Sequence, residues 1–233
     1  MDTLTVGIYN CGSPAMRQRA NARPLSRAGV ADWLDKTGRH HNIDVFVLSE
    51  AAAYARPLAN LDGWTLIDAD GWVDAGDSAI LVRDGVRVGS WRAIRMTRRW
   101  FGRRLAKWRA PRTMLTARVS WLRLLAVHMP PRPLDPRNTG AYTEQAGEII
   151  RWARRRPRWR PRAAVGDFNA ATRDSKLLHG PAYIAAQIDG TIHPQLQGID
   201  LAITRNCRVI HVKKPSDNGG SDHPFIIVTV ARG

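Results

Sequence analysis

The sequence has few cysteines and no long hydrophobic run, and both shortages limit what the protein can be. Cys11 and Cys207 are the two cysteines in 233 residues, too few for a disulfide framework, so we expect an intracellular, cytoplasmic protein. The apolar runs, such as 45–48 and 225–230, are shorter than the roughly 20 residues that span a bilayer. From these short runs we predict no membrane partner. We also see no secretory signal in the first residues.

Acidic residues are also in short supply. The chain has 36 Lys plus Arg against 20 Asp plus Glu, a formal net charge of +16, and only five of the cations are lysines. The preference for Arg over Lys leaves the charge unchanged, so it does not explain the excess of positive charge. That excess needs its own explanation. Binding of a polyanion is the commonest one, and the planar guanidinium group of arginine donates two parallel hydrogen bonds to phosphate.

Short apolar runs bounded by Gly, Pro, Asp or Asn predict an α/β protein in which strands dominate. Strands are expected at 3–9, 43–48, 64–68, 77–83, 113–119, 122–128, 163–166, 199–204, 207–213 and 224–230. Helices are expected from Ser26, which can act as the N-cap, to about residue 38, and at 139–155 and 174–187. The absence of internal repeats and long Gly/Ser linkers predicts one domain over residues 1–233.

Two basic stretches, 91–112 and 151–162, interleave tryptophans with cations, and both are expected between strands. Such segments can follow a phosphate backbone while aromatic faces pack on sugars or bases. Alternatively, each stretch is a solvated basic face whose tryptophans anchor a loop to the core. The candidate nucleic-acid-binding residues in the first stretch are Arg98, Arg99, Trp100, Arg103, Arg104 and Lys107.

Polar side chains that can bind metals or transfer protons stand at the ends of apolar runs in five places. They are Asn10, Glu50, His128, Asp167 with Asn169, and Asp222 with His223. Asp167 and Asn169 are two residues apart, which places them on the same face of an extended chain. Asp200 is expected inside an apolar strand, where a lone carboxylate is unfavourable unless it has a partner.

Each of these residues also has a structural explanation when it is taken alone. Short polar side chains end strands by bonding to nearby backbone, and His128 between two apolar residues suits a core histidine. The combination is more informative, because carboxylate and amide oxygens with two histidines and no cysteine cluster suit Mg²⁺ or Mn²⁺ better than zinc. Hydrolysis of a phosphate ester requires a metal, a base that orients water, and donors for the developing negative charge.

The segments 166–169 (Gly-Asp-Phe-Asn), 198–200 (Gly-Ile-Asp) and 221–223 (Ser-Asp-His) resemble, in the same order, motifs of the endonuclease/exonuclease/phosphatase superfamily. The resemblance covers the whole chain, from the Asn10 strand onward. It implies a monomer with a four-layer α/β/β/α sandwich of two packed mixed β-sheets flanked by helices, and a site at one edge of the sandwich.

The resemblance also implies catalytic roles. Asp167 corresponds to the residue that positions or deprotonates the attacking water, and Asn169 to the neighbouring amide that holds the phosphate. His223 corresponds to the histidine that bonds a non-bridging oxygen or assists proton transfer, with Asp200 as its orienting carboxylate. His128 corresponds to the residue that protonates the leaving oxygen.

For the metal site, the resemblance implies Glu50 as the principal ligand, with Asn10 and Asp222 completing or supporting the site. The chain departs from the family pattern at Ser49, where many members have Gln. Some members have a further acid that orients one of the histidines, and Asp77 is the candidate for it here.

Three functions follow as hypotheses. The first is a Mg²⁺- or Mn²⁺-dependent nuclease, a phosphodiesterase that hydrolyses nucleic acid, with DNA favoured over RNA. The second directs the same hydrolytic site at a phospholipid or inositol phosphate, although no amphipathic membrane helix is visible in the sequence. The third is a catalytically silent nucleic-acid-binding module of the same fold.

Overall fold

The computed structural model describes residues 2–12, 25–68, 78–94, 113–131, 133–134, 136–172 and 179–233. The elements of the first half are β1 (Thr3–Asn10), α2 (Arg27–His40), β2 (Val45–Ser49), the 3₁₀ helix η1 (Ala52–Tyr54), α3 (Ala55–Ala59), β3 (Trp64–Ile67), β4 (Ser78–Arg83) and β5 (Val88–Ile94). Those of the second half are β6 (Met114–Val119), β7 (Leu122–His128), α4 (Pro136–Arg154), β8 (Arg162–Asp167), α5 (Pro181–Gln187), β9 (Thr191–Ile192), β10 (Asp200–Arg205), β11 (Cys207–Lys213) and β12 (Ile226–Arg232).

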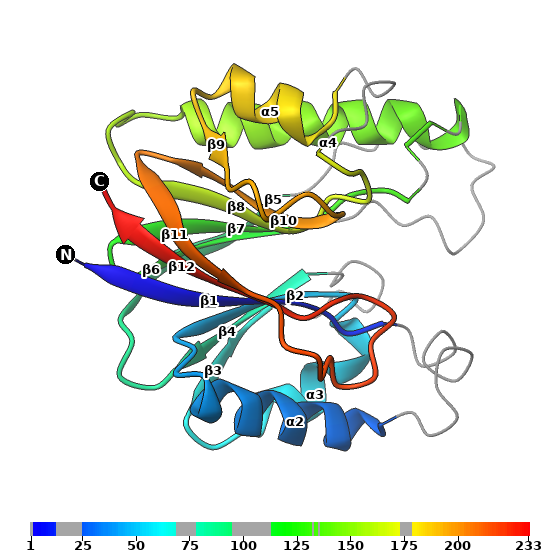
Figure 1. Ribbon diagram of the computed structural model, residues 1–233, viewed down its shortest axis with the longest axis vertical. Helices are drawn as coiled ribbons and strands as arrows, with labels where there is room; N and C mark the ends of the chain where they lie inside the picture. The colour runs from blue at the N-terminus through cyan, green and yellow to red at the C-terminus, as the bar shows by residue number, and fades with distance from the viewer. Residues whose placement is uncertain are drawn as a thin grey trace.

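These elements form four layers. The first sheet has the order β11-β12-β1-β2-β4-β3, and the second has the order β5-β6-β7-β8-β10-β9. The two sheets lie against each other, with α2 and α3 outside the first and α4 and α5 outside the second (Figure 1). The predicted four-layer α/β/β/α sandwich is therefore confirmed.

Both sheets are mixed, with one parallel pair at the centre of each. β1 is parallel to β2, and β7 is parallel to β8, whereas the other paired strands are antiparallel. Strands at the centre of a layered fold are buried on both faces, which explains their continuous apolar sequences. In β2, for example, Val45 and Val47 belong to the core between the sheets, while Phe46 and Leu48 belong to the core under α2.

The main helices begin and end near their predicted limits. Ser26 is the N-cap of α2, and its Oγ accepts a hydrogen bond from the Gly29 N–H at 3.0 Å, as predicted. Of the predicted helix 174–187, residues 174–178 lie outside the described residues, and the described part forms α5, which begins at Pro181, a residue suited to the first turn of a helix. None of the described helices is long and apolar enough to cross a lipid bilayer.

The sequence prediction missed α3 and two strands, β5 and β9. The basic stretch 91–112 was expected between strands, which is wrong for residues 91–94 because they belong to β5. β5 lies at the edge of the second sheet and exposes Ser90, Trp91 and Arg92, so its sequence lacks the alternation of a half-buried strand.

The two central parallel pairs end at the same edge of the sandwich. Asn10 pairs with Ser49 at the end of β1 and β2, and His128 pairs with Asp167 at the end of β7 and β8. The Ser49 hydroxyl donates to the backbone carbonyl of Val127 at 3.4 Å and links the two sheets at this point. The side chains that follow the four central strands are therefore brought together from distant parts of the chain.

Candidate active site

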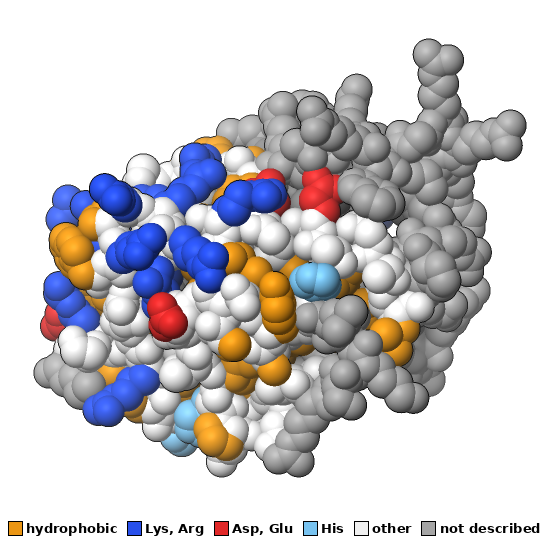
Figure 2. Space-filling view, turned by 90° about the horizontal axis from the view of Figure 1, so that it is seen from above, with side chains coloured by type: hydrophobic (Ala, Val, Ile, Leu, Met, Phe, Trp, Pro, Cys, Tyr) orange, Lys and Arg blue, Asp and Glu red, His pale blue; other side chains and the backbone are white. Residues whose placement is uncertain are grey.

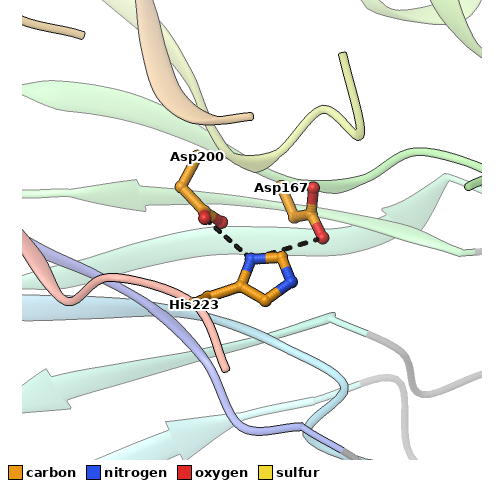
Figure 3. Close-up of side chains that lie close together, drawn as sticks. All are labelled: Asp167, Asp200 and His223. Carbon is orange, nitrogen blue, oxygen red and sulfur yellow. Dashed lines mark hydrogen bonds and ion pairs between the residues drawn. The ribbon is translucent and has the colours of Figure 1, made fainter. Parts of the chain in front are cut away.

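Two aspartates and a histidine meet at this edge. Asp167 is the last residue of β8, Asp200 is the first residue of β10, and the two are directly paired in the antiparallel ladder. The Nδ1 atom of His223 lies 2.8 Å from Asp200 Oδ2 and 4.0 Å from Asp167 Oδ2 (Figure 3). Like charges that face each other destabilise a sheet, so the imidazole beside both carboxylates stabilises this pairing.

The surroundings of His223 favour its protonated form. Burial alone lowers its pKa, but the hydrogen bond with Asp200 and the negative charges of Asp200, Asp167 and Asp222 outweigh burial and raise the pKa to about 9. Burial raises the pKa of Asp200 from its ordinary value, and the charge of Asp167 adds to this effect. At neutral pH we expect an imidazolium that donates its Nδ1 proton to the Asp200 carboxylate.

Asn10 connects the first sheet to this group. Its Nδ2 atom donates to Asp167 Oδ2 at 3.2 Å and lies 3.5 Å from the Nε2 atom of His223. Its Oδ1 atom accepts a hydrogen bond from the Gly12 N–H at 2.8 Å, which fixes the orientation of the buried amide. Asn10 therefore contacts both the predicted water-activating carboxylate and the predicted phosphate-binding histidine.

His128 and Glu50 complete the edge. The Nε2 atom of His128 lies 3.7 Å from Asp167 Oδ2 and 4.0 Å from Glu50 Oε1. Glu50 follows β2 with a φ angle of 53°, a conformation that is uncommon for residues other than glycine. The His128 side chain is 2% exposed and that of Glu50 is 31% exposed, so Glu50 remains accessible to a ligand from solvent.

The expectation that Asp200 lies in a strand and needs a partner is confirmed, because it is the buried first residue of β10 and bonds to His223. One expectation about local geometry is wrong. Asp167 and Asn169 do not share a face of an extended chain, because Asn169 has a φ angle of 49° and its N–H donates to Asp167 Oδ1 at 2.7 Å. This local bond is the turn-forming interaction typical of aspartate. The Asn169 side chain donates to the backbone carbonyl of Met129 at 2.8 Å.

The loop before β12 has supporting residues that the sequence did not reveal. The Ser221 hydroxyl donates to the Asn10 carbonyl at 2.7 Å and accepts from the His223 N–H at 3.1 Å. The Asn218 side chain donates to the carbonyls of Ser221 and His223 at 2.7 and 3.2 Å. These bonds hold His223 against β1. The Asn-Gly-Gly sequence at 218–220 signals a turn, but it does not show what the turn holds.

Helix α4 supports the other side of the edge with two buried polar side chains. The Tyr142 hydroxyl donates to the carbonyl of Phe168 at 3.1 Å, and Gln145 Nε2 donates to the carbonyl of His128 at 3.1 Å. In the sequence, the polar Gln145 on the otherwise apolar face of the predicted helix is the feature that could have indicated its contact with His128. Both bonds fix the backbone beside a predicted catalytic residue.

The donor atoms at this edge fit a hard divalent cation. Among the described residues, the Asp, Glu, His and Cys side chains close enough to share one ion are the three of Figure 3, whose ligand atoms lie within 4.8 Å of one another. Glu50 lies at the same edge outside this group, and the Asn10 Oδ1 atom accepts a hydrogen bond from the Gly12 N–H. Carboxylate and amide oxygens are the donors that Mg²⁺ and Mn²⁺ prefer. Asp222, the remaining predicted ligand, is exposed. The ligand set Asn10, Glu50 and Asp222 stays a prediction.

The rest of the predicted site lies outside the described residues. This applies to Asp77 and to the candidate nucleic-acid-binding residues Arg98, Arg99, Trp100, Arg103, Arg104 and Lys107.

The sequence matches no protein-family model and no curated protein, whereas its fold matches many solved structures. The endonuclease/exonuclease/phosphatase protein from Bacteroides vulgatus superposes with a TM-score of 0.72 over 100% of both chains, at 13% identity. The catalytic domain of human Nocturnin, with bound sulfate, superposes with a TM-score of 0.67 over 98% of this chain and 94% of that one, at 13% identity.

A third similar structure is a mannosyl-6-phosphatase from Bacteroides thetaiotaomicron, with a TM-score of 0.63 over 98% of this chain and 99% of that one, at 14% identity. At such identities the likeness shows the fold. The chain has the endonuclease/exonuclease/phosphatase fold, as its motifs predicted.

Proposed function

We propose that this protein is a divalent-metal-dependent phosphodiesterase, most suited to cleaving nucleic acid, with DNA favoured over RNA. The observation that carries the proposal is the convergence at one edge of side chains from six separate segments of the chain. They are Asn10, Glu50, His128, Asp167, Asp200 and His223.

In this proposal Asp167 is the general base. Its Oδ1 atom is held by the Asn169 N–H and its Oδ2 atom by the Asn10 amide, so the carboxylate has a fixed direction from which to orient water. The His223 imidazolium donates its Nδ1 proton to Asp200, so its Nε2–H can donate a hydrogen bond to a non-bridging phosphate oxygen. A fixed cationic donor of this kind stabilises the charge that develops in the transition state.

His128 is proposed to protonate the leaving oxygen, since its Nε2 atom faces the same carboxylate from the other side. Glu50 and Asn10 would hold Mg²⁺ or Mn²⁺, with Asp222 in support. When bound, the cation neutralises charge on the phosphate oxygens. Asn169 is proposed to contact the phosphate beside Asp167.

One observation supports nucleic acid as the substrate, and a second supports phosphate binding in general. The net charge of +16 favours a polyanion over a small neutral ester. The catalytic domain of Nocturnin, a protein of the same fold, binds sulfate, a tetrahedral anion similar to phosphate. A second candidate is phosphatase action on a smaller phosphate ester, including a phospholipid or inositol phosphate, because the mannosyl-6-phosphatase shares the fold over nearly its whole length.

The test is incubation of supercoiled plasmid with the purified protein in Mg²⁺, in Mn²⁺ and in EDTA. We expect nicking with either metal, none in EDTA, and none by Asp167→Ala. Labelled single-stranded, double-stranded, abasic and RNA substrates then define the preference. Phosphate release from inositol phosphates without cleavage of any nucleic acid would support the second candidate, and binding without turnover would indicate a silent module.

A further inference from the structure

Four arginines face one another across four neighbouring strands of the second sheet. Arg118 on β6 pairs with Arg123 on β7, Arg123 pairs with Arg162 on β8, and Arg162 pairs with Arg205 on β10. Directly paired residues point to the same face of a sheet, so the four side chains form one row. We call these four residues the arginine row.

Two members of the arginine row, Arg162 and Arg205, cap the C-terminal end of α4. Arg162 donates to the carbonyls of Trp152 and Arg155 at 2.9 and 2.7 Å, and Arg205 donates to the carbonyl of Ala153 at 2.8 Å. Cations in this position satisfy the last carbonyls of a helix, here those of α4. This capping role accounts for Arg162 and Arg205, but not for the half-buried Arg118 and Arg123, although Arg123 also donates to the Ser90 hydroxyl at 3.4 Å.

The loop after α4 adds more cations and an exposed tryptophan beside the row. Arg158 and Arg160 are exposed, and Trp159 between them is 68% exposed, with the Arg160 guanidinium 5.7 Å from its ring centroid. The backbone of the loop is anchored, because the Asn206 side chain donates to the carbonyls of Arg158 and Arg160, and the Arg123 N–H donates to that of Pro161. The loop therefore presents these side chains without a large ordering cost.

A cavity of about 260 Å³ opens between this loop and β10. It is lined by Arg154, Arg158, Ala186, Gln187, Asp189 and Arg205. Lys and Arg side chains gather on one side of the face that carries α4 and α5 (Figure 2). We call the arginine row together with the loop residues Arg158, Trp159 and Arg160 the basic edge.

Little acid offsets the basic edge. Among the described residues, Asp189 is the one acid within ion-pair distance of the arginine row, at 3.9 Å from Arg205, and its side chain is 91% exposed. Burial lowers the pKa of Arg162 to about 10, and the positive charges of Arg123, Arg205, Arg160 and Arg155 contribute. Like charges in direct register destabilise a sheet, so an anion bound here would stabilise the protein.

We propose that the basic edge binds the sugar-phosphate backbone of single-stranded nucleic acid, with an unpaired base stacked on Trp159. Arginine forks suit phosphate oxygens, and an exposed indole face accepts any base. A narrow strand can reach the half-buried guanidinium groups of Arg118 and Arg123, which a flat bilayer cannot. The inference rests on the proposed function for the identity of the ligand, but binding at this edge requires no catalysis.

The position of the basic edge relative to the active site gives the proposal a length scale. β8 and β10 each carry an aspartate at the active-site end and an arginine at the other end. Six residues of strand span about 17 Å. A nucleic acid that contacts both ends must therefore span at least this distance.

The test is equilibrium binding of a fluorescein-labelled 20-nucleotide oligothymidylate in EDTA, measured by anisotropy over a series of salt concentrations. The variants are Arg158→Gln/Arg160→Gln, Trp159→Ala and Trp159→Phe. Each arginine side chain is exposed, and the carbonyls that anchor the loop remain in every variant. The matched control is Arg27→Gln/Lys36→Gln, which removes two exposed charges from α2 in the opposite helical layer.

We expect the arginine pair to reduce the slope of log K against log salt by about 1.4, since each phosphate contact to a single strand contributes about 0.7. Trp159→Ala should weaken binding about 5-fold or more, and Trp159→Phe should restore it, because a phenyl ring still stacks on a base. The control should leave the slope unchanged.

Equal losses in the control and in the arginine pair would overturn the proposal, as would wild-type protein that binds phosphatidylserine vesicles but not the oligonucleotide. The outcome is independent of the nuclease assay. Binding through the basic edge without any cleavage would refute the proposed function alone. Cleavage combined with unaltered binding by the variants would refute this inference alone.

Discussion

The two ends of the β8/β10 pair hold opposite charges in similar surroundings. At one end Asp167 faces Asp200, and at the other Arg162 faces Arg205. The acidic end is stabilised by a histidine and an amide, whereas the basic end is stabilised mainly by the carbonyls that end α4. The first arrangement suits a cation and the second suits an anion, which is the combination that a metal-dependent enzyme acting on a polyanion requires.

The largest effect should follow from loss of the carboxylate at the acidic end. Asp167→Ala removes the proposed general base, and we expect kcat for plasmid nicking to fall about 1,000-fold or more. The matched control is Asp189→Ala, which removes an exposed carboxylate at the basic end. Its kcat should equal that of the wild type, and an equal loss in both variants would remove the distinction between the two ends.

The charge of His223 depends on its partner at the acidic end. In EDTA, its imidazole should stay protonated through neutral pH and lose its proton near pH 9. Asp200→Asn removes the hydrogen bond to an anion and one of the negative charges, so the pKa should fall toward the ordinary value of about 6.5. Titration of the imidazole nitrogens by NMR measures both values. An unchanged pKa near 9 in the variant would show that Asp200 does not control this histidine.

Loss of a carboxylate should lower the metal affinity at the acidic end but not at the basic end. Glu50→Gln keeps the size of the side chain but removes its charge. Because Glu50 is proposed to bind the metal directly, we expect Mn²⁺ binding to weaken by roughly 100-fold or more, the upper end of the loss caused by removing a residue that only orients a metal ligand. Calorimetric titration of metal-free protein with Mn²⁺ gives the affinity. Asp189→Asn serves as the control and should bind Mn²⁺ as the wild type does. If Glu50→Gln bound Mn²⁺ equally well, Glu50 would not be a ligand.

The smallest effect distinguishes two members of the arginine row. Arg162→Met leaves the carbonyls of Trp152 and Arg155 without their donors, and the free energy of unfolding should fall by about 2 kcal/mol. Arg123→Gln removes repulsion without uncapping α4, so it should change stability by less than about 0.5 kcal/mol. Urea unfolding compares them, and equal stabilities for the two variants would exclude the capping role of Arg162.

Much of the fold could be predicted because the central strands are buried on both faces. Continuous apolar runs such as 45–48 and 79–82 lie within strands, and Ser26 begins the helix it was expected to cap. β5 and β9 were missed for opposite physical reasons. β5 is an exposed edge strand with a register shift between Val88 and Trp91, and β9 has two residues, too few for a pattern.

The candidate residues could be predicted from the sequence, but only one of the contacts between them could. The place of Asp200 in an apolar strand suggested that it needs a partner, and the resemblance suggested His223, which lies 2.8 Å away. The bond from Asn10 to Asp167 joins the two sheets, so it depends on how the sheets pack and leaves no local trace in the sequence. The arginine row was invisible for the same reason, because it depends on the register of four strands.

The most direct test of the account is the location of Mn²⁺ in crystals grown at a Mn²⁺ concentration that supports plasmid cleavage. We predict an anomalous scattering peak beside Glu50 and Asn10, the proposed ligands at the active-site edge, and loss of that peak in Glu50→Gln. Cleavage-competent protein without a peak at this edge, or with its peak elsewhere, would contradict the claim that these residues form the metal-dependent active site.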